Sequence, residues 1–449
     1  MKRSAICLFL PLLCGQEQPL TEITKWQDGK QACVSLTFDD SSLNQFRIAI
    51  PLLNERGLTG TFFIITGNIP GSRHKATFVG RPPMDIIRES DKVPTTKQNV
   101  FERASLLNYL RNAQRVPEIS DFNAQRLGRL IREGTYEEVG RAVDGFMSKL
   151  RGTGVTYTVS ERERTPPAGD LGGVIRWDEF RRYAAQGHEF ASHTVTHPYM
   201  PMLDAANNIY ELEKSREDIR EQMGPKHTFS VECPYGIHDE HVMPYVLPRY
   251  PLSRNWVTDD FMEGIMRGDS RDPAVSKKEY VQWQRGPLAK TTLDDMKAWI
   301  DTSMKHGIWL VLVFHGIEGI GWEALPTETV RAYFDYIKER ENRVWVATFQ
   351  DASKYTRERM NSTVTSKAAG NTIEVSVKHN LDAALYNLPL TARTTIPADW
   401  KLVRFRQGDD TRWLPVHREE GKTYVMYRIA PNGQTAKLEK ASSPHQPIP

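Results

Sequence analysis

The sequence predicts an α/β protein: a (β/α) barrel with a helical insertion and a small C-terminal antiparallel β domain. Short apolar runs typical of buried strands alternate with amphipathic stretches of helical spacing between residues 28 and 360. No glycine-rich phosphate loop opens any of these helices, which argues against the commonest open, doubly wound sheets and favours a barrel. After residue 370 the pattern changes to two-residue alternation with turn signals, which indicates antiparallel strands.

The first strand–helix–strand unit is the clearest. Residues 32–38 form an apolar, β-branched run that ends abruptly in two aspartates. Residues 43–56 follow with helical spacing, stop at Gly57, and lead into a second apolar run at 59–65. A helix of this length between two strands predicts that the strands are parallel.

The same alternation resumes after residue 173. We expect further strands at 188–192, 228–232, 308–314 and 344–349, and helices at 179–186, 204–223, 293–306, 328–340 and 353–360. The run at 308–314 is the most apolar of the set. The alternation is therefore long enough to build most of a barrel.

Three other regions depart from this rhythm. Residues 72–173 are rich in Arg and Glu, with helical stretches at 100–112 and 122–150, and we interpret them as a helical insertion after the second strand. Residues 361–370 have the composition of a linker, 371–437 are expected to form a small β-sandwich-like domain, and 438–449 a disordered tail.

Charge and composition narrow the classes of partner. The 449 residues include 59 basic and 56 acidic side chains, a formal charge of +3, with no basic arm carrying interleaved aromatics. This balance gives no reason to expect a nucleic acid as partner.

The N-terminus has the parts of a secretory signal peptide. Lys2 and Arg3 precede a short apolar run, and polar sequence begins at Gln16, so we expect residues 1–15 to direct export to the periplasm, the cell surface or the medium. The run is too short to span a bilayer. Cys14 is the candidate for a lipid anchor, which would be the only membrane attachment, although a Leu stands where a lipoprotein signal has a small residue. The mature chain would keep Cys33 and Cys233, which is too few for a disulfide scaffold but allows one bridge.

Residues with candidate catalytic or binding roles follow four of the predicted strands. They are Asp39 and Asp40, His193 and His197, Pro234 and Tyr235, and His315. Because the carboxyl ends of barrel strands meet on one face, we expect these side chains to converge. Two imidazoles and one carboxylate leave coordination positions open for water, which suits a catalytic divalent metal.

Each of these motifs also has a purely structural explanation. Asp39 and Asp40 could cap the helix that begins near Ser41. His193 and His197 could be unrelated polar residues in a turn. Consecutive residues that leave a strand point to opposite sides, so if the site exists the two aspartates have different roles, one binding the metal and the other acting as a base.

The motifs TFDD (37–40), HTVTH (193–197), PYG (234–236) and LVFH (312–315) resemble, in this order, those of the polysaccharide deacetylases, carbohydrate esterase family 4. The resemblance covers roughly residues 30–360 apart from the insertion, and implies a distorted (β/α) barrel and a metal-dependent deacetylase. It implies that Asp39 is the catalytic base, that Asp40, His193 and His197 bind the metal, and that His315 is the acid. Tyr235 would stabilise the oxyanion through its backbone N–H.

Two positions depart from the family pattern. The family has an Arg three residues before the motif's Tyr, which holds the base, and here Glu232 occupies that position. We predict that Glu232 lies near Asp39 and raises the pKa of the base by repulsion; the alternative is that it faces outward and pairs with a basic residue. The family also has an Asp–Trp pair that lines the pocket, and Trp256 and Asp260 match it only loosely. These two residues and Pro234 are the candidates for substrate contact.

The sequence therefore predicts a hydrolase that removes acetyl groups from a carbohydrate, with N- and O-acetyl groups both open. Two nitrogen ligands and one oxygen ligand favour Zn²⁺, with Co²⁺ or Ni²⁺ as alternatives. The rival hypothesis is a non-catalytic carbohydrate-binding or cell-envelope protein on the same scaffold. Both Asp39 and His315 are present, and a pure binder would need neither.

Overall fold

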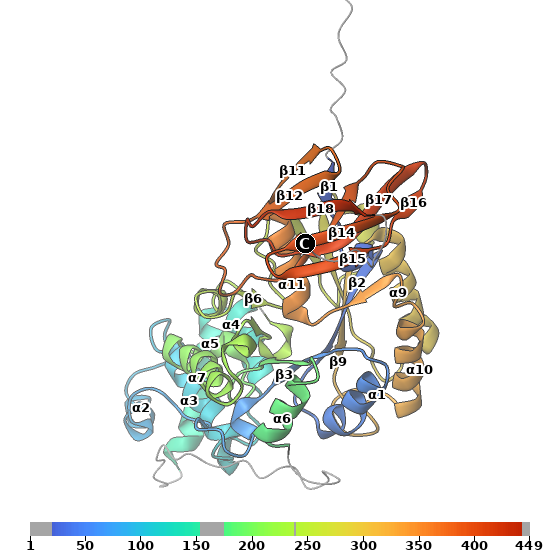
Figure 1. The fold of residues 1–449 in the computed structure, drawn as a ribbon. Coiled ribbons are helices and arrows are strands. Elements are labelled where there is room, and N and C mark those ends of the chain that lie inside the picture. The colour runs from blue at the N-terminus through green and yellow to red at the C-terminus, as the bar shows by residue number, and fades with distance from the viewer. Residues whose placement is uncertain (1–19, 153–174, 238, 442–449) are drawn as a thin grey trace, which may run out of the picture. The chain divides into compact units, whose positions relative to one another are not determined.

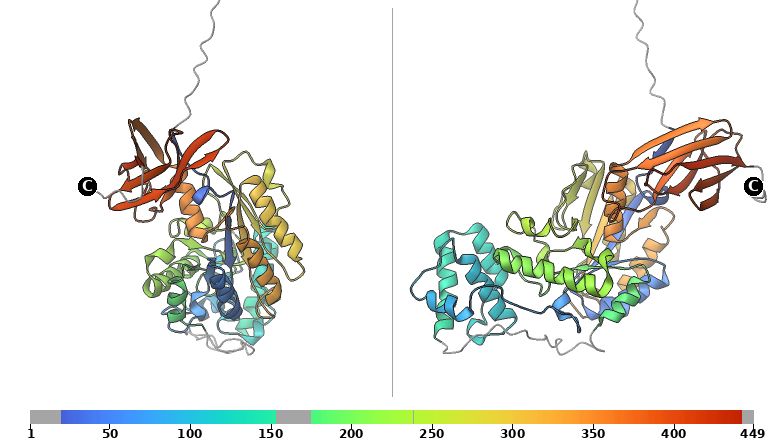
Figure 2. Two further views of the ribbon diagram at one scale, coloured as in Figure 1. Left: turned by 45° about the vertical axis from the view of Figure 1, so that its right-hand side comes forward. Right: turned by 60° about the vertical axis from the view of Figure 1, so that its left-hand side comes forward.

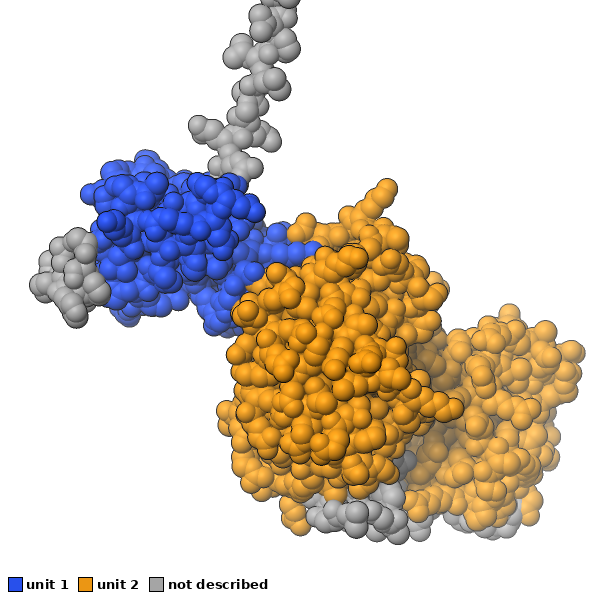
Figure 3. Space-filling model, turned by 90° about the vertical axis from the view of Figure 1, so that its right-hand side faces the viewer, with its two compact units in different colours: residues 1–29, 357–449 blue, residues 30–356 orange. Residues whose placement is uncertain are grey.

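The computed structural model describes residues 20–152, 175–237 and 239–441, so the predicted signal peptide and most of the predicted tail lie outside the described residues. The chain divides into two compact units (Figure 3). One contains residues 30–356, and the other combines residues 1–29 with 357–449.

The unit of residues 30–356 is built on a nine-stranded parallel sheet. Its path runs β6-β5-β4-β3-β2-β9-β8-β7, and β10 pairs with the start of β2. The strands are β2 (Ala32–Phe38), β3 (Thr61–Ile64), β4 (Glu189–Ser192), β5 (Ser230–Val231), β6 (Leu252–Ser253), β7 (Met262–Ile265), β8 (Tyr280–Arg285), β9 (Trp309–Phe314) and β10 (Val344–Val346).

Helices cover this sheet, and the unit is a distorted (β/α) barrel, as predicted (Figure 1). They are α1 (Ile50–Glu55), α6 (Trp177–Ala184), α7 (Ala205–Met223), α8 (Met243–Val246), α9 (Leu293–His306), α10 (Thr327–Lys338) and α11 (Phe349–Met360), which continues past residue 356. Within the described residues no ladder joins β6 to β7, so the sheet stays open between them.

The core explains why the central strands have apolar sequences. All seven residues of β2 are buried because its neighbours and the helices cover both faces. Phe38 stacks on Phe62 of β3 and Phe314 of β9, with ring centroids 4.7 and 5.1 Å apart. This aromatic stack lies directly below the strand ends that carry Asp39 and His315.

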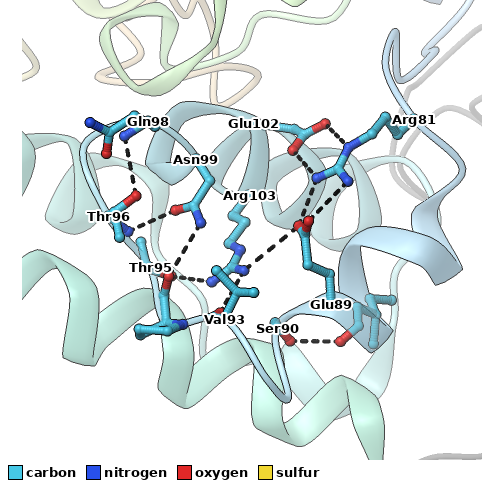
Figure 4. A network of polar contacts seen from close by, with 12 residues as sticks. Arg81, Glu89, Ser90, Val93, Thr95, Thr96, Gln98, Asn99, Glu102 and Arg103 are labelled. Atoms are coloured by element: carbon cyan, nitrogen blue, oxygen red, sulfur yellow. Dashed lines mark hydrogen bonds and ion pairs between the residues drawn. The ribbon is translucent and has the colours of Figure 1, made fainter.

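The insertion forms a helical group with its own apolar core, and in Figure 2 its cyan helices gather at one end of the unit. The helices are α2 (Pro83–Glu89), α3 (Val100–Asn112), α4 (Ala124–Glu133) and α5 (Tyr136–Arg151). A polar network also ties them together (Figure 4). The fully buried Arg103 donates to Thr95 and to the carbonyl of Val93, and Arg81 bridges Glu89 and Glu102. Residues 153–174, the last part of the predicted insertion, lie outside the described residues.

The other unit contains two antiparallel sheets, with strand orders β1-β13-β17-β16 and β11-β12-β18-β14-β15. The strands are β1 (Thr21–Ile23), β11 (Thr363–Ala369), β12 (Thr372–Lys378), β13 (Leu390–Thr395), β14 (Leu402–Gln407), β15 (Asp410–Leu414), β16 (His417–Glu419), β17 (Lys422–Ile429) and β18 (Ala436–Ala441). Rings of Phe405 and Tyr427, one from each sheet, lie 5.1 Å apart. The small antiparallel β domain predicted at the C-terminus is thus present, and β1 adds a strand that the sequence pattern did not reveal.

Two predicted boundaries are wrong. The predicted linker at 361–370 contains β11, an edge strand whose mostly exposed side chains made its composition resemble a linker. The predicted tail begins inside β18, because residues 438–441 pair with β14. In both places polar residues on the open face of a sheet hide the strand.

Two further features bear on the sequence predictions. Cys33 and Cys233 are buried and free, so the structure does not form the bridge that the sequence allowed. No helix in the described ranges combines the length and apolar content needed to cross a membrane.

Candidate metal centre and active site

The predicted catalytic residues meet at the carboxyl ends of the parallel strands. Asp39 and Asp40 follow β2, His193 follows β4, and His315 follows β9. These four and His197 line one cavity of about 770 Å³. The strand-end rule therefore brings together residues that are up to 276 positions apart in the chain, from 39 to 315.

Asp40, His193 and His197 form a cluster that could hold a metal ion. One ligand atom from each lies within 4.8 Å of the other two. Asp40 Oδ1 is 3.5 Å from His193 Nε2 and 3.2 Å from His197 Nε2. These are the three residues predicted as ligands.

Hydrogen bonding of His193 supports this assignment. Its Nδ1 lies 2.8 Å from the backbone carbonyl of Glu232, which can only accept, so Nδ1 carries the proton. A neutral His193 then presents the lone pair of Nε2 to the Asp40 carboxylate. Two acceptors facing each other need a cation or a proton between them, and a second hydrogen bond of this kind is the usual way a metal-binding imidazole is oriented.

A buried carboxylate holds the histidine loop in shape. Glu211 of α7 accepts hydrogen bonds from the backbone N–H groups of Val195 and Thr196, at 2.9 and 2.8 Å, and from the Thr196 hydroxyl at 2.6 Å. On the other side Gly67 approaches so closely that an added Cβ would lie 2.6 Å from the Val195 carbonyl oxygen. The loop is thus fixed from both sides.

Left-handed backbone conformations concentrate at this site. The non-glycine residues with positive φ beside it are Asp40 (73°), Ser41 (57°), Thr194 (67°), His197 (60°) and Tyr235 (65°). Such conformations cost about 1–3 kcal/mol each and persist where the surroundings enforce them, most often at functional sites. Asp40 and His197, two of the three candidate ligands, are therefore held in place by the backbone itself.

Asp39 is held by an arginine that the sequence motifs did not identify. Arg254, directly after β6, donates from Nη1 to Asp39 Oδ1 at 2.8 Å and from Nη2 to Oδ2 at 2.5 Å. Its Nη2 is also 3.2 Å from Glu232 Oε1. Glu232 and Arg254 follow positions 231 and 253, which are paired in the β5–β6 register. The motif resemblance implied an arginine at position 232; Glu232 stands there, and the arginine that holds Asp39 directly follows the neighbouring strand β6.

Glu232 lies near the base, as predicted, but the pKa of Asp39 moves in the direction opposite to our prediction. Burial would raise the pKa of Asp39, yet the charge and hydrogen bonds of Arg254 outweigh it and hold that pKa below its ordinary value. Burial raises the pKa of Glu232 to about 7, Arg254 opposes the rise, and Asp39 adds to it. Asn255 also donates to Glu232 Oε1, while Oε2 is buried without a partner in the described structure.

His315 lies next to the base. Its Nε2 is 3.6 Å from Asp39 Oδ2. Gln45 Nε2 donates to the backbone carbonyls of both Asp39 and His315, which ties the two strand ends together. Burial lowers the pKa of His315, and the charge of Asp39 opposes this shift. The half-exposed Trp322 packs edge-on against the imidazole, with ring centroids 4.7 Å apart.

The remaining predicted residues divide into two groups. Tyr235 lines the cavity, and its exposed ring lies 4.8 Å from that of His197. Pro234, also predicted to contact substrate, is buried directly before it and is not among the lining residues. Trp256 and Asp260, predicted to contact substrate, are not among the lining residues. Trp256 packs against the apolar cluster beneath α8, and Asp260 is exposed away from the cavity, because the chain turns after Asn255.

Sequence reasoning also missed several residues that line the cavity. They are Arg254 and Asn255 after β6, Arg267 after β7, Gln284 at the end of β8, Arg129 and Arg132 on α4, and Trp322 after β9. β6, β7 and β8 were not predicted, since β6 has two residues and the other two contain polar or small residues. Had these strands been recognised, the strand-end rule would have identified Arg254, Arg267 and Gln284.

The fold and the site define a class: a distorted (β/α)-barrel protein with a candidate Asp–His–His metal centre at the carboxyl ends of its strands. The sequence model of the polysaccharide deacetylase family matches residues 27–92 and 139–247. This match, over less than half of the chain, confirms the resemblance seen in the motifs.

Individual relatives are distant. A gellan lyase of Bacillus sp. is 23% identical over 284 residues, which are 60% of this chain and 11% of that protein, so the chain spans about a tenth of that relative's length. Among solved structures, the Xyl-CE4 domain of a xylanase from the hindgut metagenome of Trinervitermes trinervoides is 14% identical, covering 72% of this chain and 89% of that one at a TM-score of 0.33. A family 4 carbohydrate esterase of Streptomyces lividans is 12% identical, and the match covers 71% of this chain and 92% of that one at a TM-score of 0.31.

Proposed function

We propose that this chain is a metal-dependent hydrolase that removes acetyl groups from a carbohydrate. The observation that carries the proposal is the convergence, in one cavity, of a three-ligand cluster with a separate carboxylate–imidazole pair. The match to the polysaccharide deacetylase family model supports acetylated carbohydrate as the substrate. N-acetyl and O-acetyl substrates are distinguished by the acetate-release assay.

Asp40, His193 and His197 would hold the metal, and two nitrogens with one carboxylate oxygen favour Zn²⁺ over Co²⁺ and Ni²⁺ as the physiological ion. When bound, a divalent ion would supply Lewis acidity, which lowers the pKa of water and polarises a carbonyl group.

The chain's own groups then supply acid–base catalysis. Asp39, kept ionised by Arg254, would accept the proton of the attacking water. The backbone N–H of Tyr235 would stabilise the oxyanion. His315 would donate a proton to the departing sugar nitrogen or oxygen, and the exposed ring of Trp322 beside it offers an apolar face for a sugar ring. For each acetyl group removed, the reaction would consume one water and release one acetate.

The rival hypothesis, a non-catalytic carbohydrate binder, does not account for Asp39. A binder has no need of a fully buried carboxylate aligned by two arginine hydrogen bonds and placed 3.6 Å from an imidazole. Burying a carboxylate costs free energy of desolvation, which the pairing with Arg254 offsets, and a binding role alone gives no reason for this arrangement.

Acetate release from a panel of N- and O-acetylated oligosaccharides tests the proposal. We expect release by the metal-loaded protein, its loss after chelation, and its recovery with Zn²⁺. Metal content and acetate release should both fall in His193→Ala. A protein that binds these sugars but releases no acetate with metal bound would support the binder instead.

We also propose that residues 1–15 direct export and are removed; the alternative is that cleavage falls before Cys14, which is then kept as a lipid anchor. N-terminal sequencing of the mature protein, together with its partitioning into detergent, tests both points. A mature protein that begins at Met1 would contradict the proposed export signal.

A further inference from the structure

The cavity beside the metal cluster is rich in arginine. Arg129 and Arg132 enter it from α4 of the insertion, and Arg267 enters it from the loop after β7. Arg129 and Arg132 lie three residues apart on α4, Arg267 comes from a distant part of the chain, and all three add to Arg254, which is already paired with the base.

The three arginines have few close acidic partners. In the described part of the chain, Arg129 and Arg267 form no ion pair with an acidic side chain, and Asp39, Glu232 and Asp40 act on Arg267 only from further away. Arg132 has only its exposed neighbour Glu133, at 3.8 Å, and donates a hydrogen bond to the hydroxyl of Tyr199. The cavity's two lining carboxylates are engaged elsewhere, Asp39 with Arg254 and Asp40 with the histidines.

The structure makes room for Arg267 at this place. Its guanidinium carbon lies 5.5 Å from the centre of the Trp322 ring, beside His315. A Cβ at Gly286 would lie 2.4 Å from Arg267 Cδ, so the glycine leaves the space that the arginine stem occupies. Arg132 is positioned by the buried ring of Tyr199, whose centre lies 5.7 Å from the guanidinium carbon.

Unpaired arginines in a concave site attract and orient anions. Their planar guanidinium groups match the oxygens of carboxylate, sulfate and phosphate groups. Arg129, Arg132 and Arg267 are exposed and so within reach of a ligand in the cavity. A neutral sugar offers hydroxyl groups, which need no such excess of positive charge.

We propose that the acetylated carbohydrate is acidic, with an anionic substituent, in the first instance the carboxylate of a uronic acid, bound by Arg129, Arg132 and Arg267. This inference rests on the proposed deacetylase function. A sulfate or phosphate ester presents similar oxygens, and the substrates of the test separate these sources.

The test compares matched substrates. Acetate release is measured on an acetylated uronic-acid oligosaccharide, on the same compound with its carboxyl reduced to an alcohol, and on an acetylated sulfated oligosaccharide. We expect kcat/KM to be about tenfold or more higher for the best anion than for the reduced compound, as for a charge-assisted hydrogen bond. The preference should shrink as salt is added.

Variants locate the effect. Arg129→Gln and Arg267→Gln should each lower kcat/KM more on the anionic substrate than on the reduced compound, so that the preference for the anion shrinks. Arg126→Gln is the matched control, since Arg126 is exposed on the same helix but does not line the cavity. Thermal unfolding confirms that each variant is folded.

The outcomes separate the two proposals. Equal or faster release from the reduced compound would overturn the anionic substrate while leaving the deacetylase proposal intact. Release from none of the substrates by metal-loaded protein would count against the deacetylase proposal. A preference for the sulfated compound over the carboxylate would support the arginine site and reject uronic acid as its ligand.

Discussion

At the residue scale, the main difference from the motif pattern that the sequence resembles is that Arg254 holds Asp39 while Glu232 stands at the motif's arginine position. Both residues reach the base because they follow paired positions of two neighbouring parallel strands. Glu232 then competes with Asp39 for the one guanidinium group. The pair should therefore tune the base in opposite directions.

Arg254→Met and Glu232→Gln are expected to move the acidic limb of the kcat/KM–pH profile in opposite directions. Without Arg254, burial raises the pKa of Asp39, so more of the base is protonated and the limb moves to higher pH. Without the charge of Glu232, Arg254 pairs with Asp39 alone, so the pKa of Asp39 falls and the limb moves to lower pH. Arg254→Met should also lower turnover about 10- to 100-fold, as is typical for a group that orients an active-site residue. Shifts in the same direction would contradict this role.

The base and the acid should be separable from metal binding. Asp39→Asn and His315→Ala are each expected to reduce acetate release by about 10²–10⁴-fold, the usual contribution of acid–base catalysis. Metal content, measured by atomic emission, should stay near that of the wild type in both, in contrast to His193→Ala. If either variant kept wild-type turnover, the role given to that residue would be wrong.

At the scale of elements, helix α4 carries two of the cavity arginines and packs tightly on the site. Gly128 lies against Tyr199, where an added Cβ would be 2.0 Å from a ring carbon. Tyr199 in turn accepts a hydrogen bond from Arg132 and lines the cavity. The contact between this glycine and this ring thus sets the distance of α4 from the metal cluster.

Gly128→Ala is expected to destabilise the protein by about 1–3 kcal/mol, as overpacking does, and to raise KM as α4 moves outward. Gly145→Ala is the matched control: Gly145 lies in helix α5 with nothing within 4 Å of an added Cβ. It should stabilise the protein by about 0.5–1 kcal/mol and leave KM unchanged. Chemical denaturation and acetate-release kinetics measure both. An unaltered KM in Gly128→Ala would show that α4 does not shape the substrate site.

At the scale of the whole molecule, the barrel unit contains the complete candidate site. The residues lining the cavity lie between Asp39 and Trp322, within the unit of residues 30–356. The second unit is formed by both ends of the chain, since β1 pairs with β13. Its two sheets contribute none of the lining residues.

A fragment of residues 30–361, which keeps α11 whole, is therefore expected to retain metal binding and a kcat close to that of the full chain on a short oligosaccharide. Circular dichroism checks folding, and acetate release checks activity. A folded fragment that binds metal but has lost turnover would mean that the second unit takes part in catalysis.

The sequence by itself determined the strong parts of the fold and the ligand cluster. Strands such as Ala32–Phe38 and Trp309–Phe314 are buried on both faces, so nearly every residue is apolar and the run is visible without a partner. The polar residues directly after them could then be placed on one face of the barrel, because parallel strands end together. Asp39, Asp40, His193, His197 and His315 were found in this way.

Only the tertiary structure decided how that site is completed. β6 has two residues, and β7 has two partly exposed ones, so their patterns are too short or too mixed to reveal strands, and Arg254 and Arg267 after them went unseen. The partner of Asp39 lies 215 residues away, and only the pairing of β5 with β6 shows that Glu232 and Arg254 both lie beside it. Local sequence records which residues are buried on both faces, whereas charge pairing across strands depends on three-dimensional register.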